Sequence, residues 1–140
     1  MSNLPLLSGN VLEQTVKSVF VTKGFTVIPY KMWLGGGGDF LLTRVPFKSI
    51  YGHNGHTEFK AVSDRFKLDV RIECKWQRGA GSVDEKLPYL FLNCVNTMPE
   101  RELMVVIDGD GFRAGSISWL RNAARACKSK KIHVFNLKEF

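Results

Sequence analysis

The chain has 140 residues, 44% of them hydrophobic, which is typical of one globular domain. No apolar run approaches the roughly 20 residues that span a bilayer, and the N-terminus lacks the pattern of a signal peptide, so we expect a cytoplasmic protein without a membrane partner. The formal net charge of +7 favours an anionic partner, most often a nucleic acid. Three widely spaced cysteines, Cys74, Cys94 and Cys127, argue against a disulfide framework and a cysteine zinc site.

The first part of the chain predicts a helix and then an extended segment. Asn10 and Glu13 have the spacing of a capping box, and apolar residues recur after them at helical intervals, so we expect a helix over residues 10–23. Residues 26–33 are expected to be extended. Four glycines follow at positions 35–38, and ordering them costs backbone entropy. They predict a mobile loop that either connects two segments or approaches a ligand.

A three-stranded antiparallel meander is predicted next. Residues 41–52 and 56–62 flank the Asn54-Gly55 pair, a strong signal for a hairpin turn. Residues 66–76 form a long strand in which apolar and polar residues alternate, and its polar side carries Lys67, Asp69, Arg71, Glu73, Lys75 and Gln77. Because this strand is the most apolar in the chain, we expect it inside the sheet, with the polar side facing a cleft.

Two helix-strand units complete the chain. Ser82 and Glu85 form a second capping box, which predicts a helix to about residue 95 with a kink at Pro88. A strand over residues 103–107 precedes a third helix, which begins at Ser116 or Ser118 and turns Trp119, Leu120, Ala123 and Ala124 inward. Residues 131–136 form the last strand. The order αβββαβ with an added αβ unit implies an α/β fold, a central mixed sheet flanked by helices, in a single domain over residues 1–140.

Glu73 and Lys75 are the candidate catalytic pair. Two residues apart on a strand, they project the same way about 7 Å apart, so they can share one phosphate, the carboxylate through a metal and the ammonium directly. Hydrolysis of a phosphodiester needs a metal-activated water, and Mg²⁺ is held by one or two carboxylates. Glu58, 73 − 58 = 15 residues earlier, fits the second carboxylate through the hairpin. The alternatives are Asp69, Asp64 and Asp39.

The tripeptide Glu73-Cys74-Lys75, on a strand after a hairpin with an upstream acid and before a helix, resembles the motif of the PD-(D/E)XK (restriction-endonuclease-like) nuclease superfamily. The wider run over residues 71–77, with residues 81–86 beyond it, is similar to stretches in restriction-enzyme-like and phage-encoded members. The resemblance implies a restriction-endonuclease-like core and a Mg²⁺-dependent DNA endonuclease, in which Mn²⁺ can substitute. Cleavage of both strands would require a homodimer.

The resemblance also implies roles for individual residues. Glu58, Glu73 and the main-chain carbonyl of Cys74 would bind the metal, and Lys75 would activate water or stabilise the developing charge. Gln77 follows the motif as in several subfamilies, and Glu13 corresponds to a glutamate that some members place on the first helix. The chain departs from the family pattern before Glu58, where residue 57 is threonine and not proline.

Basic residues near the predicted site are expected to neutralise DNA phosphates. They are Lys48, Lys60, Arg65, Lys67, Arg71 and Arg78. Two alternatives within the same fold remain, a catalytically inactive DNA-binding module and a junction-resolving nuclease. An enzyme acting on a phosphorylated metabolite is disfavoured, because no phosphate-binding glycine motif follows a strand.

Overall fold

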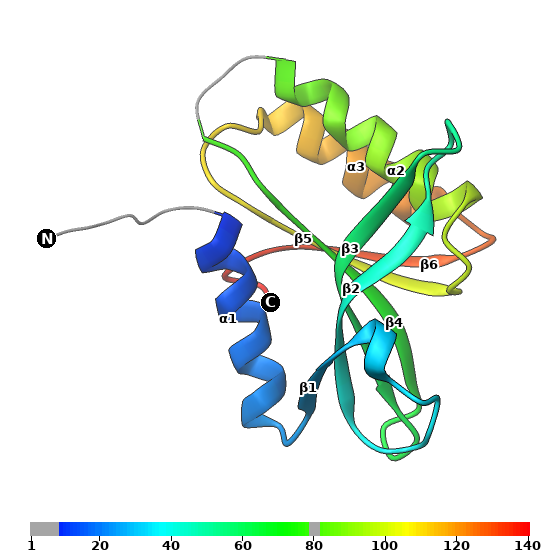
Figure 1. The fold of residues 1–140 in the computed structure, drawn as a ribbon. Coiled ribbons are helices and arrows are strands. Elements are labelled where there is room, and N and C mark those ends of the chain that lie inside the picture. Colours follow the sequence, from blue (N-terminus) through cyan, green and yellow to red (C-terminus); the bar gives the residue numbers. More distant parts are fainter. Residues whose placement is uncertain (1–8, 79–81) are drawn as a thin grey trace, which may run out of the picture.

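The computed structural model describes residues 9–78 and 82–140. Helices and strands follow the predicted order, except that residues 30–32 of the predicted extended segment form a short helix (Figure 1). In chain order they are α1 (Gly9–Thr22), β1 (Thr26–Pro29), the short helix η1 (Tyr30–Met32), β2 (Phe40–Lys48), β3 (Asn54–Ser63), β4 (Leu68–Trp76), the short helix η2 (Ser82–Glu85), α2 (Lys86–Asn96), β5 (Glu102–Asp108), α3 (Ala114–Ala126) and β6 (Lys131–Asn136). None of the described helices is long and apolar enough to cross a membrane.

The described strands form one mixed sheet in the order β1-β2-β3-β4-β5-β6. β2, β3 and β4 are antiparallel neighbours, whereas β1 runs parallel to β2 and β4, β5 and β6 run parallel to one another. This arrangement confirms the predicted α/β class and the position of β4 inside the sheet. Parallel neighbours need crossover connections, which α2 supplies between β4 and β5 and α3 between β5 and β6, while η1 and residues 33–39 connect β1 to β2.

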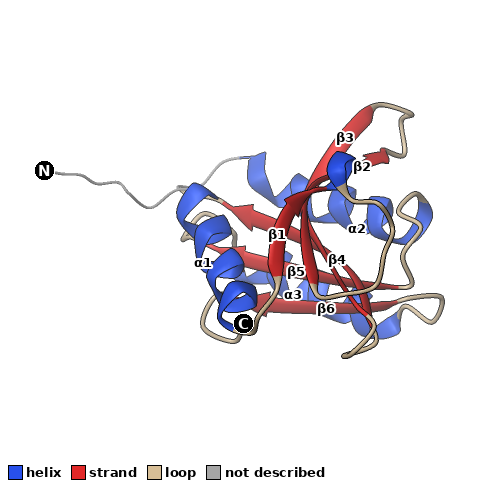
Figure 2. Cartoon of the chain, turned by 60° about the horizontal axis from the view of Figure 1, so that its bottom comes forward, coloured by secondary structure: helices blue, strands red, loops and turns tan. Residues whose placement is uncertain are grey.

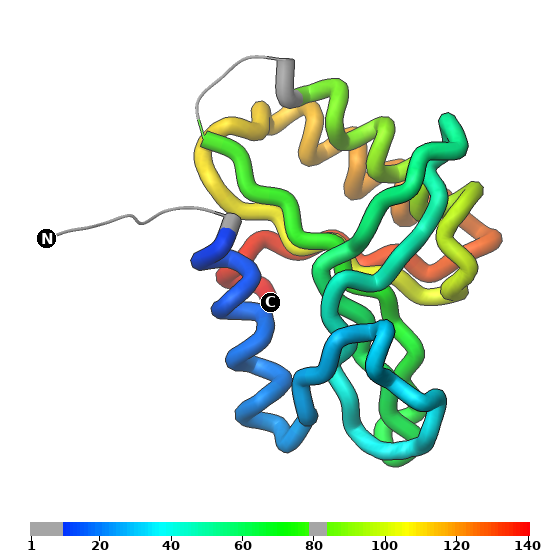
Figure 3. The backbone as a smooth tube through the Cα atoms, viewed as in Figure 1, coloured from blue at the N-terminus to red at the C-terminus, as the bar shows by residue number. Residues whose placement is uncertain are grey.

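Helices cover both faces of the sheet, α1 on one side and α2 with α3 on the other (Figure 2). On α1, the predicted apolar stripe is buried against strands β2, β3 and β4 by Leu12, Val16 and Phe20. The last residues of the chain return to this face, where Phe140 lies 6.2 Å from Phe20 between ring centroids (Figure 3). The other face buries Leu87, Leu90, Leu103, Val105 and Leu120.

The turn of the β2–β3 hairpin lies earlier than predicted. Asn54 and Gly55 belong to β3, where they pair with Lys48 and Phe47. The turn is made by residues 49–53, in which the Ser49 N–H donates to the His53 carbonyl (2.8 Å) and Gly52 adopts a φ of 81°. The Ser49 hydroxyl also accepts the N–H of residues 51 and 53, so its local hydrogen bonds outweigh the preference of Asn-Gly.

Three helix details also differ from the prediction. The helix predicted from Ser82 begins as the short helix η2, and Pro88 lies in the first turn of α2, where no intrahelical N–H bond is lost. Helix α3 begins at Ala114, before Ser116, whose hydroxyl donates to the Arg113 carbonyl instead of capping the helix. Trp119 is 45% exposed and packs edge-on against Phe91, whereas Leu120 is fully buried. The capping role of the Ser82 side chain lies outside the described residues.

Candidate active site

The strands β3 and β4 separate at the candidate site. Their ladder ends at the pair Phe59 and Ile72, so the next step would pair Glu58 with Glu73. Instead, the main-chain N–H of Cys74 donates to Oε1 of Glu58 (2.7 Å). β4 stays paired with β5 as far as Trp76. The Glu58 carboxylate therefore occupies the place that the backbone of β3 has left.

A local distortion turns Glu58 toward this gap. Phe59 packs against the α1 side, but Thr57, which regular alternation would put on the same side, receives a hydrogen bond from Arg71 on the opposite side (3.0 Å). Arg44, the residue of β2 facing Glu58, has a φ of 52°, an uncommon conformation for a residue with a Cβ. The break in alternation at Glu58 thus coincides with a strained residue on the neighbouring strand.

Glu73 and Lys75 form the centre of the site. The Lys75 Nζ lies 3.4 Å from Oε1 of Glu73, and Glu73 is only 4% exposed. Burial is the main reason that the pKa of Glu73 rises to about 8, and the nearby Glu58 carboxylate raises it further while Lys75 opposes the rise. Although burial alone would lower the pKa of Lys75, the charges of Glu73 and Glu58 raise it above its usual value.

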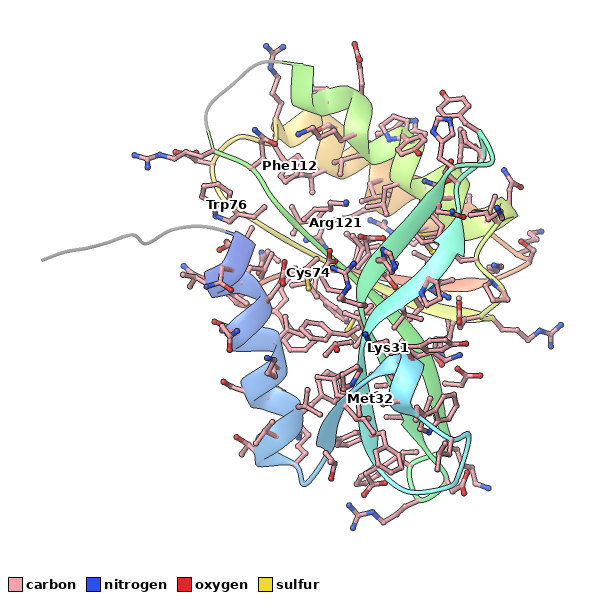
Figure 4. All side chains as sticks on the ribbon, viewed as in Figure 1. Lys31, Met32, Cys74, Trp76, Phe112 and Arg121 are labelled. Carbon is pink, nitrogen blue, oxygen red and sulfur yellow. The ribbon has the colours of Figure 1, made fainter. Side chains whose placement is uncertain are left out.

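Glu13 of α1 approaches the same site from the other face of the sheet. Its pKa is raised by burial and by the charge of Glu58, and both residues line one cavity of about 390 Å³. Glu73 and Lys75 line a second cavity of about 540 Å³ with α2 residues that include Tyr89 and Asn93. The structure therefore brings the three predicted glutamates and the predicted lysine together. Figure 4 shows Cys74 and Trp76 along β4, with Phe112 on the side of α2.

Gln77 is held just beyond β4. Its main chain bonds to both ends of the turn after β5, donating to the Asp108 carbonyl (3.2 Å) and accepting from the Gly111 N–H (2.8 Å). The Gln77 side chain accepts a hydrogen bond from Lys86 Nζ (2.9 Å). Lys86 is exposed and also lines the cavity of Glu73. It lies 86 − 75 = 11 residues after Lys75, and no sequence signal distinguishes it from other helix lysines.

The aspartates that were alternatives to Glu58 lie away from Glu73. Asp39 accepts hydrogen bonds from Ser63 (2.5 Å) and Arg65 (2.7 Å) at the β3–β4 turn, which also contains Asp64. This turn is about 16 Å from Glu73, because β4 rises about 3.3 Å per residue. Asp69 is mostly exposed and pairs with Lys60. Among the predicted second ligands, Glu58 is the one whose carboxylate interacts with Glu73.

Two of the six basic residues predicted to contact DNA face the protein interior. Arg71 is 3% exposed and its guanidinium donates to both oxygens of Glu100, at 2.5 and 3.1 Å. Lys60 pairs with the same carboxylate at 3.0 Å. Because both cations are neutralised internally, we leave them out of the DNA-contacting set. The other four, Lys48, Arg65, Lys67 and Arg78, are exposed, and Arg65 pairs with Asp39.

The donors at the site suit a divalent cation that prefers oxygen. Within residues 9–78 and 82–140, no three His, Cys, Asp or Glu side chains are arranged to hold a metal ion together. Mg²⁺ does not require three, since it keeps several waters and takes one or two carboxylates. Glu58 and Glu73, with the Cys74 carbonyl, are such a set, and a cation there would favour the charged form of the buried Glu73.

Comparison with known proteins agrees with this geometry. Residues 6–140 match a family model described as a PD-(D/E)XK nuclease superfamily domain. The match covers 140 − 6 + 1 = 135 of the 140 residues, so the chain belongs to the PD-(D/E)XK nuclease superfamily. Neither a curated protein nor a solved structure matches the chain.

Proposed function

We propose that this nuclease is a Mg²⁺-dependent endonuclease that hydrolyses phosphodiester bonds in DNA, with residues 1–140 acting as one nuclease domain. The proposal depends on one observation: the side chains of Glu58, Glu73 and Lys75 lie together at the point where β3 and β4 stop pairing. A buried carboxylate and a half-buried one beside an ammonium combine metal ligands with a partner for a phosphate oxygen. Mn²⁺ offers a similar preference for oxygen ligands and should substitute.

Each residue has a distinct role in the proposed reaction. Glu58, Glu73 and the Cys74 carbonyl would hold Mg²⁺, which when bound acidifies a coordinated water and polarises the phosphate. Lys75 keeps its proton, because its pKa is raised by the two carboxylates. Its role is therefore to orient the attacking water and to stabilise negative charge on the phosphate rather than to abstract a proton.

The outer residues support this centre. Glu13 adds a further carboxylate beside Glu58 and can accept a hydrogen bond at the edge of the site. The hydrogen bond between Gln77 and Lys86 fixes both side chains at the rim of the cavity. Lys48, Arg65, Lys67 and Arg78 remain proposed contacts for DNA phosphates. One chain provides one such centre, so we propose that a homodimer cuts both strands.

A plasmid-nicking assay tests the proposal. Supercoiled DNA should be nicked with Mg²⁺ and left intact with EDTA. Glu73→Gln and Lys75→Met should each reduce the rate about 100-fold or more while DNA binding is retained, since they remove groups used in the reaction. Asp64→Asn and Asp69→Asn are matched controls that should cut at the wild-type rate. Binding without cleavage by the wild-type protein would identify an inactive DNA-binding module instead.

A further inference from the structure

A basic cavity of about 610 Å³ lies at the end of the molecule where α2 and α3 finish, away from Glu73. The turn between α3 and β6, orange at the right of Figure 1, forms much of it. Its cationic lining consists of Arg101, Arg125, Lys128, Lys130 and Lys131, and no Asp or Glu lines it. We call this surface the basic cavity.

One of the five cations has a structural role. Lys130 Nζ donates to the carbonyl of Cys94 (2.8 Å) and to that of Met98, and so satisfies acceptors at the end of α2. The other four cations have no described carboxylate within ion-pair distance. Elsewhere, Lys60, Arg65, Arg71, Lys75, Arg113 and Arg121 each have such a carboxylate, whereas nine other described cations, among them Lys23, Lys48 and Lys138, do not. The feature that distinguishes the basic cavity is therefore that four such cations line one concave surface.

Helix dipoles do not account for this concentration of charge. A helix C-terminus carries about half a negative charge, so the ends of α2 and α3 together supply about one. Lys130, which bonds directly to carbonyls at the end of α2, already offsets that amount. Four positive charges remain around a concave surface. Such a surface suits a ligand with several regularly spaced negative charges.

We infer that the basic cavity binds the backbone phosphates of DNA outside the cleavage site. This inference rests on the proposed function. Without a bound cation, the catalytic centre places Glu13, Glu58 and Glu73 around a single ammonium, so it offers no net positive charge to attract phosphates. Affinity for the DNA backbone must therefore come from cations elsewhere on the protein.

Strand β5 gives the separation of the two places. Val105 on β5 pairs with Glu73, and Arg101, which lines the basic cavity, lies 105 − 101 = 4 residues earlier in the chain. At about 3.3 Å per residue, this separation is about 13 Å. Successive phosphates on a strand rise about 3.4 Å, so a duplex lying in this direction reaches the basic cavity roughly four steps from the cut.

The test is the salt dependence of binding to a 24-base-pair duplex, measured in EDTA so that no cleavage is needed. The double variant Lys128→Ala/Lys131→Ala should reduce the slope of log Kd against log salt by about 1.8, the value for two lost phosphate contacts. Lys23→Ala/Lys138→Ala removes the same charge from exposed positions elsewhere and should leave the slope unchanged. The charge-preserving Lys128→Arg/Lys131→Arg should keep the wild-type slope.

Other outcomes overturn the inference without deciding whether the protein is a nuclease. Equal slopes for wild type and Lys128→Ala/Lys131→Ala would show that the basic cavity does not bind DNA. The same conclusion would follow if Lys128→Ala/Lys131→Ala and Lys23→Ala/Lys138→Ala reduced the slope equally. Inorganic phosphate is titrated separately against the wild type. Saturable phosphate binding with an unchanged DNA slope would mark a small-anion site. Conversely, loss of slope in a protein that never cuts would support the inference and refute the proposed function.

Discussion

Glu73 is a carboxyl group that the fold buries before any cation is bound. Its pKa in the folded protein is about 8, against about 4.5 when unfolded, chiefly because burial disfavours the charged form. The folded state therefore prefers the protonated acid. This contribution to stability is complete below about pH 4.5 and is lost as the pH rises through 8.

Glu73→Gln should remove this pH dependence. In EDTA, the wild-type melting temperature should fall between pH 5 and pH 8.5 by more than that of the variant, and the variant should be the more stable at pH 8.5. Thermal unfolding followed by circular dichroism gives both values. Glu85→Gln, at an exposed position, is the control and should follow the wild type. Parallel pH profiles for wild type and Glu73→Gln would contradict a buried, protonated Glu73.

At the scale of secondary-structure elements, Arg71 joins three strands. From β4 it donates to the carbonyls of Val45 and Pro46 on β2 and to Thr57 on β3, besides its ion pair with Glu100. These bonds hold the strands together just before β3 leaves β4. The pKa of Glu100 is lowered because the hydrogen bonds and charge of Arg71 outweigh the effect of burial.

Removing one member of this ion pair should be costly. Glu100→Gln leaves the buried guanidinium without a counter-charge and should reduce the free energy of unfolding by about 3–5 kcal/mol. The double variant Arg71→Met/Glu100→Met should lose less, because no buried charge is left alone. Urea unfolding at pH 7 measures both. If Glu100→Gln reduced the free energy of unfolding by less than Arg71→Met/Glu100→Met, the buried guanidinium would not need Glu100 as its counter-charge.

Elements with strong periodicity could be predicted from the sequence, and turns that depend on competing local bonds could not. The apolar stripe gave α1 to within a residue at each end, and β6 matched its predicted residues 131–136. The hairpin turn was misplaced, because the Asn54-Gly55 preference is smaller than the combined bonds of Ser49 and the tie between the Ile50 N–H and Asn93 (2.8 Å). That last contact joins residues 43 positions apart.

At the scale of the whole molecule, the candidate site could also be predicted only where it depends on residues close together in the sequence. Spacing on one strand was enough to propose Glu73 and Lys75, and hairpin geometry was enough to propose Glu58. Alternation alone made Arg71 a DNA contact, because it shares a face with Glu73. Its burial depends on Glu100, 29 residues later, which closes that part of the face. Sequence patterns within one strand contain no information about such a partner.

The number of centres per chain gives a prediction about assembly. A chain with one centre should nick plasmid DNA at low protein concentration, and linear DNA should appear at higher concentration with a steeper than first-order dependence. Gel analysis of initial rates over a concentration series measures both products. Linear DNA formed in first-order proportion to protein at every concentration, with no nicked intermediate, would contradict cleavage by separate chains that must associate.

The extension of β4 beyond β3 also places an optical reporter at the site. Trp76 ends this strand, one residue after Lys75 and one before Gln77, and is only partly buried. The protein has two other tryptophans. Trp33 directly follows η1, and Trp119 lies on α3. Replacing those two with phenylalanine would leave the intrinsic fluorescence of the protein to a single indole. Its emission should then respond to cation or DNA entering beside Glu73, so that occupancy can be followed in real time without a label.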